Sequence, residues 1–195
     1  MDFNFTFLIC ISTLPTLPAH SHTFLYIVYQ YKEMSDTTSG FMELMGNPVK
    51  LKYFLFSKLP SAYFSGVRVK KFDPGFSEVT VPYKWFSQNP FRSTYFACLS
   101  MAAEMSTGFL AMMHVYKRNP AVSMLVLSVN GSFHKKATGV TTFRCDDGNR
   151  LREVIDEAIA TGEGKIIQTT SKGTNDNGEL VADFVITWSF KAKKK

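Results

Sequence analysis

The sequence has few cysteines. Among its 195 residues only Cys10, Cys98 and Cys145 are cysteine, and no two of them have the short spacing of a metal-binding pair. An odd and scattered set of three argues against a disulfide framework and against structural zinc. We therefore interpret Cys98 and Cys145 as small buried hydrophobic residues, and we predict a cytoplasmic protein without a metal or cofactor.

A concentrated basic surface is also missing. The net charge is 22 − 16 = +6, but four of the lysines lie among the last five residues, so the rest of the chain carries only 6 − 4 = +2. The remaining Lys and Arg residues are scattered, unlike the basic groove of a nucleic-acid-binding protein. We expect residues 191–195 to be a solvated basic tail and predict no nucleic-acid partner.

No apolar run is long enough to cross a membrane at the N-terminus. The run over residues 3–11 is followed by Pro15 and Pro18, lacks a preceding Lys or Arg, and falls far short of the ~20 residues of a membrane span. Three interpretations of residues 1–33 stay open. They are an upstream over-extension before a true start at Met34, a signal peptide, or a real extension that packs on the domain.

The composition that remains is that of one folded domain. Hydrophobic residues make up 45% and charged residues 19% of the chain, which excludes intrinsic disorder. There is no internal repeat. We predict a single domain over residues 34–190.

Hydrophobic periodicity predicts an α+β fold. Helices are predicted over residues 42–64, 93–114 and 151–159, and strands over 67–70, 76–81, 122–129, 139–145, 165–171 and 180–190. Turn residues 73–75 and 174–178 separate neighbouring strands. This order predicts a mostly antiparallel, curved sheet wrapped around one long buried helix, with an extra helix inserted between two strands.

The predicted helix 93–114 carries the main functional candidate. It is apolar on every side, as expected of a buried helix. Small residues recur along it at three- and four-residue steps, at Ala97, Ser100, Thr107, Gly108 and Ala111. Glu104 lies in this stripe, and burying an unpaired carboxylate costs several kcal/mol. Glu104 must therefore be neutral, be paired, or face a cleft as a functional residue. The structural alternative is a carboxylate that caps a backbone amide.

The sequence before this helix resembles a known enzyme family. Asn89-Pro-Phe-Arg-Ser-Thr-Tyr-Phe-Ala97, followed by Glu104, resembles the hotdog-fold acyl-CoA thioesterases of the phenylacetate-pathway and 4-hydroxybenzoyl-CoA type. That family carries Asn-x-x-Gly-x-x-His-Gly-Gly and an acidic residue seven positions further on. The resemblance covers residues 67–190, including the hairpins at 133–139 and 177–182. It is closest to a hotdog subfamily known only as a domain of unknown function.

The chain departs from the family at its glycines. Arg92, Phe96 and Ala97 replace all three. In the family, a backbone N–H at the start of the buried helix is directed at the thioester oxygen, and Ala97 can still donate such a bond. The ring of Phe96, in contrast, lies where the family leaves room for the acyl group or the pantetheine arm.

The resemblance implies a homodimer or a dimer of dimers that hydrolyses an acyl-CoA or acyl-carrier thioester between two subunits. Glu104 would act as general base or nucleophile, Asn89 would position the water or the carbonyl, and the Ala97 N–H would bind the oxyanion. The implied substrate-binding residues are Arg92, Tyr95, Phe96, Ser100, Lys135 and Lys136.

Other interpretations of these residues stay open. Lys135 and Lys136 could contact CoA phosphates or be merely solvated, and residues 85–89 could form a ligand rim or an aromatic packing cluster. His114 is expected to interact with the helix dipole, or else to pair with a carboxylate. The alternative functions are a non-catalytic acyl-CoA or lipid-binding module and a purely structural hotdog. A cleft that reaches Glu104 favours the thioesterase, and a cleft that bypasses Glu104 favours the binding module. A core without a cleft favours the structural hotdog.

Overall fold

Six strands form one antiparallel sheet in the order β1-β2-β4-β5-β6-β3. The structure is a computed structural model and describes residues 37–193, so the predicted extension over residues 1–33 lies outside the described residues. The strands are β1 (Arg68–Phe72), β2 (Ser77–Pro82), β3 (Val122–Phe133), β4 (Val140–Cys145), β5 (Lys165–Thr174) and β6 (Leu180–Ala192). The predicted antiparallel sheet is confirmed, and β6 extends as far as Ala192.

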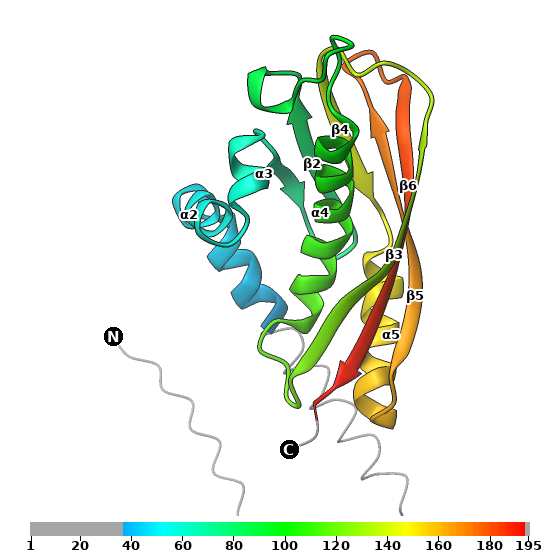
Figure 1. The fold of residues 1–195 in the computed structure, drawn as a ribbon. Coiled ribbons are helices and arrows are strands. Elements are labelled where there is room, and N and C mark those ends of the chain that lie inside the picture. Colours follow the sequence, from blue (N-terminus) through cyan, green and yellow to red (C-terminus); the bar gives the residue numbers. More distant parts are fainter. Residues whose placement is uncertain (1–36, 194–195) are drawn as a thin grey trace, which may run out of the picture. The chain divides into compact units, whose positions relative to one another are not determined.

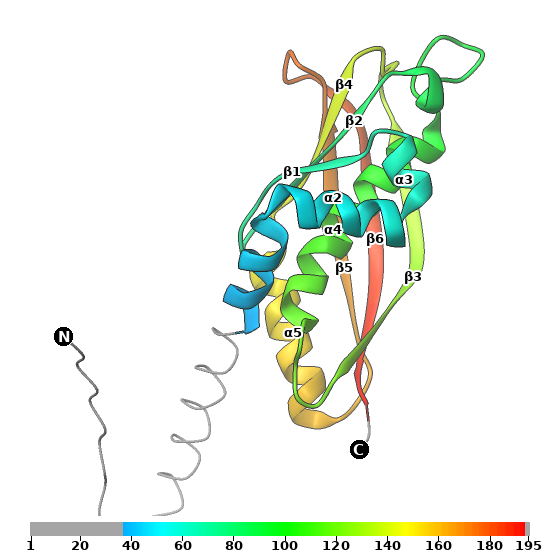
Figure 2. The same ribbon diagram turned by 90° about the vertical axis from the view of Figure 1, so that its left-hand side faces the viewer.

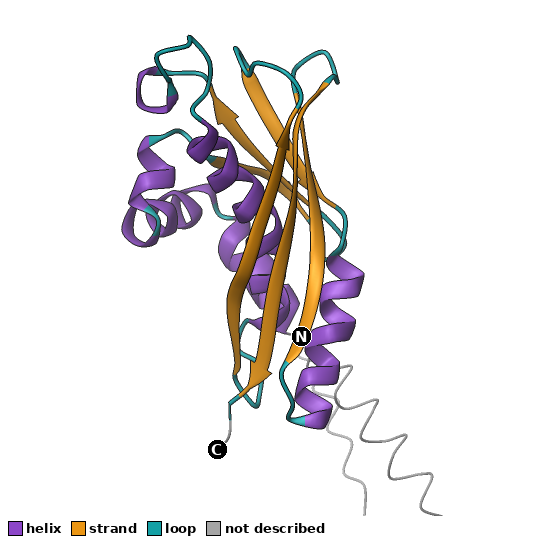
Figure 3. Cartoon of the chain, turned by 45° about the vertical axis from the view of Figure 1, so that its right-hand side comes forward, coloured by secondary structure: helices purple, strands orange, loops and turns teal. Residues whose placement is uncertain are grey.

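The sheet curves around one long helix (Figures 1 and 3). The helices are α2 (Pro48–Lys58), α3 (Pro60–Phe64), the 3-10 helix η1 (Trp85–Ser87), α4 (Phe96–Val115) and α5 (Gly148–Thr161), and residues 37–46 are also helical. α4 contacts all six strands and 13 of its residues are buried. By length and composition α4 could cross a membrane, but here it is the core helix of the domain. The predicted enclosure of this helix is confirmed.

α4 begins at Phe96, three residues later than the sequence predicts. The preceding backbone is held in extended conformation by other hydrogen bonds. The Thr94 N–H donates to Ala137 O at 2.8 Å and the Tyr95 N–H donates to Ser87 O at 2.7 Å. The first bond fixes the loop between η1 and α4 against the loop between β3 and β4, and the second ties the start of α4 back to η1.

The inserted helix α5 packs on α4, β5 and β6. Gly162 ends it in the left-handed conformation (φ +70°). Asp147 is its N-cap residue but makes no side-chain capping bond. Its carboxylate instead accepts from the Thr170 N–H at 2.8 Å and from Arg150 Nη1 at 2.8 Å. Asp147 therefore ties α5 to β5.

α2 and α3 form a further layer, which crosses in front of α4 in Figure 2. Asn47 caps α2 through its side chain, which accepts from the Val49 and Lys50 N–H groups, and Pro48 occupies the first turn. Leu55 is buried in the core, whereas Val49 on the other side of α2 is 75% exposed. One side of α2 is therefore apolar and unpartnered.

Candidate functional site

A groove of about 620 Å³ opens between the η1–α4 loop and the segment that follows β3. It is lined by Asn89, Pro90, Phe91, Ser93, Thr94, Tyr95, Phe96, Leu99, Phe133, His134, Lys135, Lys136 and Ala137. Five of the predicted site residues are among them, namely Asn89, Tyr95, Phe96, Lys135 and Lys136. The other four, Arg92, Ala97, Ser100 and Glu104, are not. The sequence therefore predicts the two segments that form the groove.

Aromatic rings line one wall of the groove. Tyr95 and Phe96 meet edge-to-face with ring centres 4.8 Å apart, and Phe96 and Phe133 lie at 6.4 Å. Phe133 in turn contacts the buried Phe184 at 5.6 Å. Such a wall suits an acyl or aromatic acyl group, because its aromatic rings offer a large apolar contact area. Phe133 was missed by the sequence interpretation, which assigned its hairpin but not the direction of its side chains.

Asn89 organises the loop that carries this wall. Its Oδ1 accepts from the Phe91 N–H at 2.9 Å and from the Ser93 N–H at 3.2 Å, and its Nδ2 contacts Ser93 Oγ at 3.1 Å. Since Oδ1 is already engaged, only the second Nδ2 hydrogen is free for a ligand. The catalytic role of Asn89 stays a prediction, and its observed role is to hold the loop.

Arg92 shows why the related family has a glycine at this point. Its φ is +58°, in the left-handed region that residues with a β-carbon rarely adopt. Its side chain is exposed and lies outside the groove lining. Arg92 therefore adopts a backbone conformation suited to glycine, at a cost in backbone strain.

This strain gives a stability prediction. Arg92→Gly should raise the free energy of unfolding by about 0.5–1 kcal/mol, because glycine adopts this φ freely. The gain is limited by the greater flexibility of glycine in the unfolded chain. Urea unfolding monitored by circular dichroism measures it. Arg92→Ala is the control, since it removes the charge and keeps the strain, and equal stability of both variants would contradict the explanation.

The start of α4 carries two free backbone donors. Tyr95, the N-cap, makes no side-chain capping bond, and its carbonyl accepts from the Cys98 and Leu99 N–H groups at 2.9 and 3.3 Å. The Phe96 and Ala97 N–H groups donate to no group in the described chain. Free N–H groups together with the helix dipole attract a developing negative charge.

Glu104 lies two turns further along α4 and is half-buried. In the described part of the chain, no donor or cation pairs with its carboxylate. The carboxylate lies against Gly108, where an added β-carbon would be 3.0 Å from Oε1 and 3.1 Å from the ring of Trp188. Burial raises the pKa of Glu104 above its usual value. The alternative of a carboxylate that caps a backbone amide has no support in these contacts.

The rest of the small-residue stripe divides into two parts. Ala97 and Ser100 are half-buried like Glu104, and the Ser100 hydroxyl donates to Phe96 O at 3.0 Å. Thr107 is buried and its Oγ1 accepts from Trp188 Nε1 at 3.0 Å. Only the first half of the stripe is therefore accessible to a ligand or a partner.

Within one chain Glu104 and the free N–H groups are apart. Seven residues separate Ala97 from Glu104, which places them about 10 Å apart along the helix axis. Glu104 also does not line the groove. The groove of a single chain therefore does not bring this carboxylate and these donors together.

The two lysines of the groove differ. Lys135 forms an ion pair with Glu179, and this contact lowers the pKa of Glu179. Lys136 has no carboxylate partner in the part of the chain that the structure describes, and its Nζ lies 3.4 Å from Phe91 O. His134 pairs with Asp183. Of these groups, Lys136 is the one with its charge available to an anionic ligand.

His114 is a structural residue. It is buried, and its Nε2 lies 3.0 Å from Pro74 O in the β1–β2 turn. Burial lowers the pKa of His114, so the ring is neutral at neutral pH and donates from Nε2. The structure shows a contact of His114 with the β1–β2 turn, and the expected interaction with the helix dipole stays a prediction. Across residues 37–193, no cluster of His, Cys, Asp and Glu has the geometry of a metal site.

Comparison with known proteins agrees with this fold. The protein-family model described as a domain of unknown function (DUF4442) matches residues 51–190. Search among curated proteins found no match. A protein of unknown function from Pseudomonas aeruginosa, a probable thioesterase, is 21% identical, with a TM-score of 0.63 over 75% of this chain and 97% of its own.

Two further solved structures have the same fold. A thioesterase from Haemophilus influenzae is 14% identical, with a TM-score of 0.56 over 73% of this chain and 89% of its own. A mutant thioesterase from Pseudomonas aeruginosa is 14% identical, with a TM-score of 0.57 over 74% and 94%. At these identities the likeness establishes the hotdog fold.

Proposed function

Because the chain belongs to the DUF4442 family and has the hotdog fold of known thioesterases, we propose that it hydrolyses an acyl-CoA or acyl-carrier thioester. One observation carries this proposal. α4 presents two free N–H groups at its start and, on its half-buried side, a carboxylate of raised pKa without a partner. Thioester hydrolysis needs both a donor for the oxyanion and a base for water.

The residues have these roles in the proposed reaction. Glu104 removes a proton from water, and the water oxygen bonds to the thioester carbonyl carbon. The carbonyl oxygen becomes an oxyanion that accepts hydrogen bonds from the Ala97 and Phe96 N–H groups. The C–S bond then breaks, and the thiolate takes the proton from Glu104. Asn89 holds the loop in place through its bonds to Ser93 and Phe91.

The proposal includes a homodimer, because one chain does not bring these groups together. In a symmetric dimer the groove of one chain would receive Glu104 from the other. A dimer of dimers would keep the same pairs. The free cysteines Cys98 and Cys145 fit the cytoplasmic location that we propose for such a dimer.

The β3 edge is the surface that we assign to this dimer. Among the strands of residues 37–193, β3 pairs only with β6; it is 12 residues long and contains no charged residue. Leu125, Leu127 and Val129 on it are 63%, 49% and 44% exposed. The other sheet edge, β1, is short and carries exposed Lys70 and Lys71, which discourage pairing. A long uncharged apolar edge instead favours pairing with a second copy.

This assignment predicts the oligomeric state of a variant. Leu125→Lys combined with Val129→Lys should convert a dimer to a monomer, because lysines on an edge strand oppose strand pairing. Sedimentation velocity measures the mass. Ile166→Lys is the matched control, because Ile166 is 62% exposed but lies on the inner strand β5. A variant that stays dimeric would exclude the β3 edge as the interface.

The groove suggests the class of substrate. Its wall of aromatic rings would contact the acyl group or the pantetheine arm, and Lys136 would meet a phosphate. Tyr95 and Phe96 belong to this wall, whereas Arg92, Ser100 and the ion-paired Lys135 stay outside the substrate contacts that we propose.

Turnover of a panel of acyl-CoAs tests the function. The purified full chain would be incubated with short, long and aromatic acyl-CoAs, and the released thiol would be measured with a thiol-reactive dye. We expect hydrolysis of at least one chain class, with saturation kinetics. If no acyl-CoA of the panel releases thiol although acyl-CoA binds tightly, the proposed thioesterase activity is wrong.

A second function has a specific observation in its favour. The groove of a single chain does not reach Glu104. Phe96, which is 54% exposed, lies on the wall of this groove. This is the arrangement expected of a module that binds acyl-CoA or lipid without cleaving it. Binding of acyl-CoA by calorimetry without thiol release would identify this function.

A further inference from the structure

An exposed group of aromatic side chains lies on α2, α3 and η1, outside the groove. We call it the aromatic face. Its members are Tyr53, Phe56, Phe64, Trp85 and Phe86, which are 70%, 51%, 52%, 75% and 61% exposed, together with Val49. Apolar patches of this kind on a folded domain are rare unless a partner covers them.

Four of the five rings of the aromatic face, those other than Tyr53, form one connected series. Trp85 and Phe86 lie 4.8 Å apart, Phe86 and Phe64 5.9 Å, and Phe64 and Phe56 6.1 Å between ring centres. The contacts join three elements that are separated in sequence. The aromatic face is therefore a built surface that the fold assembles, rather than a set of unrelated exposed residues.

α2 shows how the sequence directs these side chains outward. Leu51 and Leu55 face the core, whereas Val49, Tyr53 and Phe56, at positions i, i+4 and i+7, lie along the opposite side. On a helical projection Lys50 and Lys52 flank this exposed stripe on its two sides. An apolar stripe bordered by lysines is the pattern of a helix that lies in a membrane interface.

The charges around the aromatic face are of one sign. From residue 44 to residue 72 the chain contains six Lys or Arg residues and no Asp or Glu. Lys50, Lys52, Lys58 and, beside Trp85, Lys84 are exposed, and none of them forms an ion pair in the described part of the chain. These cations remain available to an anionic surface.

A second groove, of about 480 Å³, lies beside the aromatic face. It is lined by Leu44, Met45, Val49, Lys50, Tyr53, Phe54, Ser57 and Lys58. Apolar side chains and a tyrosine make up most of its lining, together with Lys50 and Lys58. A lipid, with an apolar tail and an anionic headgroup, has the matching chemistry.

We infer from these observations that the aromatic face docks on the surface of an anionic phospholipid membrane. Trp, Tyr and Phe enter the headgroup region, where amphipathic aromatic rings are favoured, and the lysines contact the anionic headgroups. A protein partner would need acidic groups of its own to satisfy these lysines, whereas an anionic bilayer presents them at every position of the surface.

Vesicle flotation tests the inference. The full 195-residue chain would be mixed with vesicles of phosphatidylcholine alone, or of phosphatidylcholine with phosphatidylserine. We expect flotation with the anionic vesicles and at least about tenfold weaker partitioning with the neutral ones, because several lysines contribute. Raising the salt concentration should weaken the binding to the anionic vesicles.

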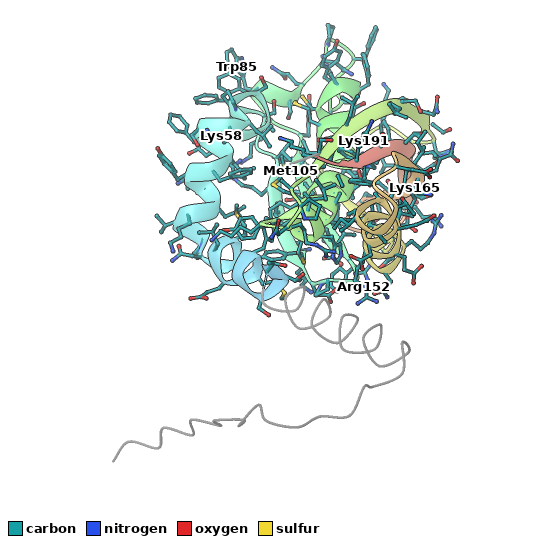
Figure 4. The ribbon with its side chains drawn as sticks, turned by 90° about the horizontal axis from the view of Figure 1, so that it is seen from below. Lys58, Trp85, Met105, Arg152, Lys165 and Lys191 are labelled. Atoms are coloured by element: carbon teal, nitrogen blue, oxygen red, sulfur yellow. The ribbon has the colours of Figure 1, made fainter. Side chains whose placement is uncertain are left out.

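Two variants separate the apolar and the charged contributions. Tyr53→Ser with Trp85→Ser removes aromatic contact, and Lys50→Glu with Lys52→Glu reverses the flanking charge. Each pair should weaken partitioning by at least about tenfold. Figure 4 shows Lys58 and Trp85 on one side of the molecule, away from Lys165 and Lys191.

Matched controls lie on β5 and β6, which carry none of the residues of the aromatic face. Ile166→Ser and Lys191→Glu should leave partitioning unchanged, and thermal unfolding should show that every variant is folded. The inference is wrong if the unaltered chain does not float, or if the two pairs bind as well as it does. It is also wrong if Tyr53→Ser with Trp85→Ser lowers the mass in sedimentation velocity, since the aromatic face would then be a contact between copies.

Discussion

Glu104→Gln should lower kcat for thioester hydrolysis by at least about 100-fold and change KM much less. Glutamine keeps the size of the side chain but cannot take a proton from water. The effect falls on kcat because the carboxylate acts on the attacking water rather than on substrate binding. Steady-state turnover of the best acyl-CoA from the panel measures both constants.

A surface carboxylate provides the control for this result. Glu153→Gln alters an exposed residue of α5 and should leave turnover unchanged. Unchanged turnover in Glu104→Gln would remove Glu104 from the mechanism. If neither form turns over substrate while both bind acyl-CoA, the protein is the non-catalytic binding module.

The raised pKa of Glu104 adds a pH dependence to the same variant. Burial disfavours the charged form of Glu104 in the folded state. The free energy of unfolding therefore falls as the pH rises from the pKa of Glu104 in the unfolded chain to its raised pKa in the folded protein. Glu104→Gln should therefore have a higher Tm than the unaltered protein near neutral pH. At a pH below the ordinary carboxyl pKa the two Tm values should converge. Turnover by the unaltered enzyme should rise with pH across the raised pKa, because only the carboxylate is a base.

The sequence predicts the fold well because short stretches of it carry patterns that have one structural solution in the whole domain. The run from Phe96 to Val115 has no polar side, which only an enclosed helix can satisfy. The hairpin between β5 and β6 likewise follows from its turn residues alone. Gly178 in this turn has a φ of +78°. The first turn of α4 was assigned too early, because tertiary hydrogen bonds to Thr94 and Tyr95 compete with the helix.

The candidate site is predicted less completely, for physical reasons. Periodicity finds the apolar residues of α2 but cannot tell that Leu55 faces the core and Tyr53 the solvent, since both sides of that helix are apolar. The Asn89-to-Glu104 spacing identifies two functional candidates, but Asn89 lines the groove from the loop before α4, whereas Glu104 lies two turns into α4 and does not line that groove. Whether they meet depends on a second chain, and a single sequence does not contain that geometry.

The second large effect is expected from Ala97→Pro, which deletes one of the two free N–H groups at the start of α4. Proline is tolerated in the first turn of a helix, so the fold should persist. Turnover should fall about 100- to 1,000-fold, the usual loss for one oxyanion donor. The same variant also tests whether each site combines two chains.

Co-expression of Ala97→Pro with Glu104→Gln makes that test. Neither homodimer is active, but a mixed dimer has one site with an intact N–H from one chain and an intact Glu104 from the other. Half of the dimers are mixed and each has one active site of two, so turnover should recover to about a quarter of the unaltered level.

A chain that carries both changes is the matched control. Co-expressed in equal amount with the unaltered chain, it should leave about a quarter of full turnover if sites are shared, because both sites of a mixed dimer are then defective. If each chain forms its own site, about half of full turnover should remain, and the two single variants should not rescue each other. Measured mass and thermal unfolding of the mixed samples would verify that dimers have formed. The ratio of the two experiments thus decides whether Glu104 of one chain acts on the substrate held by the α4 N-terminus of the other.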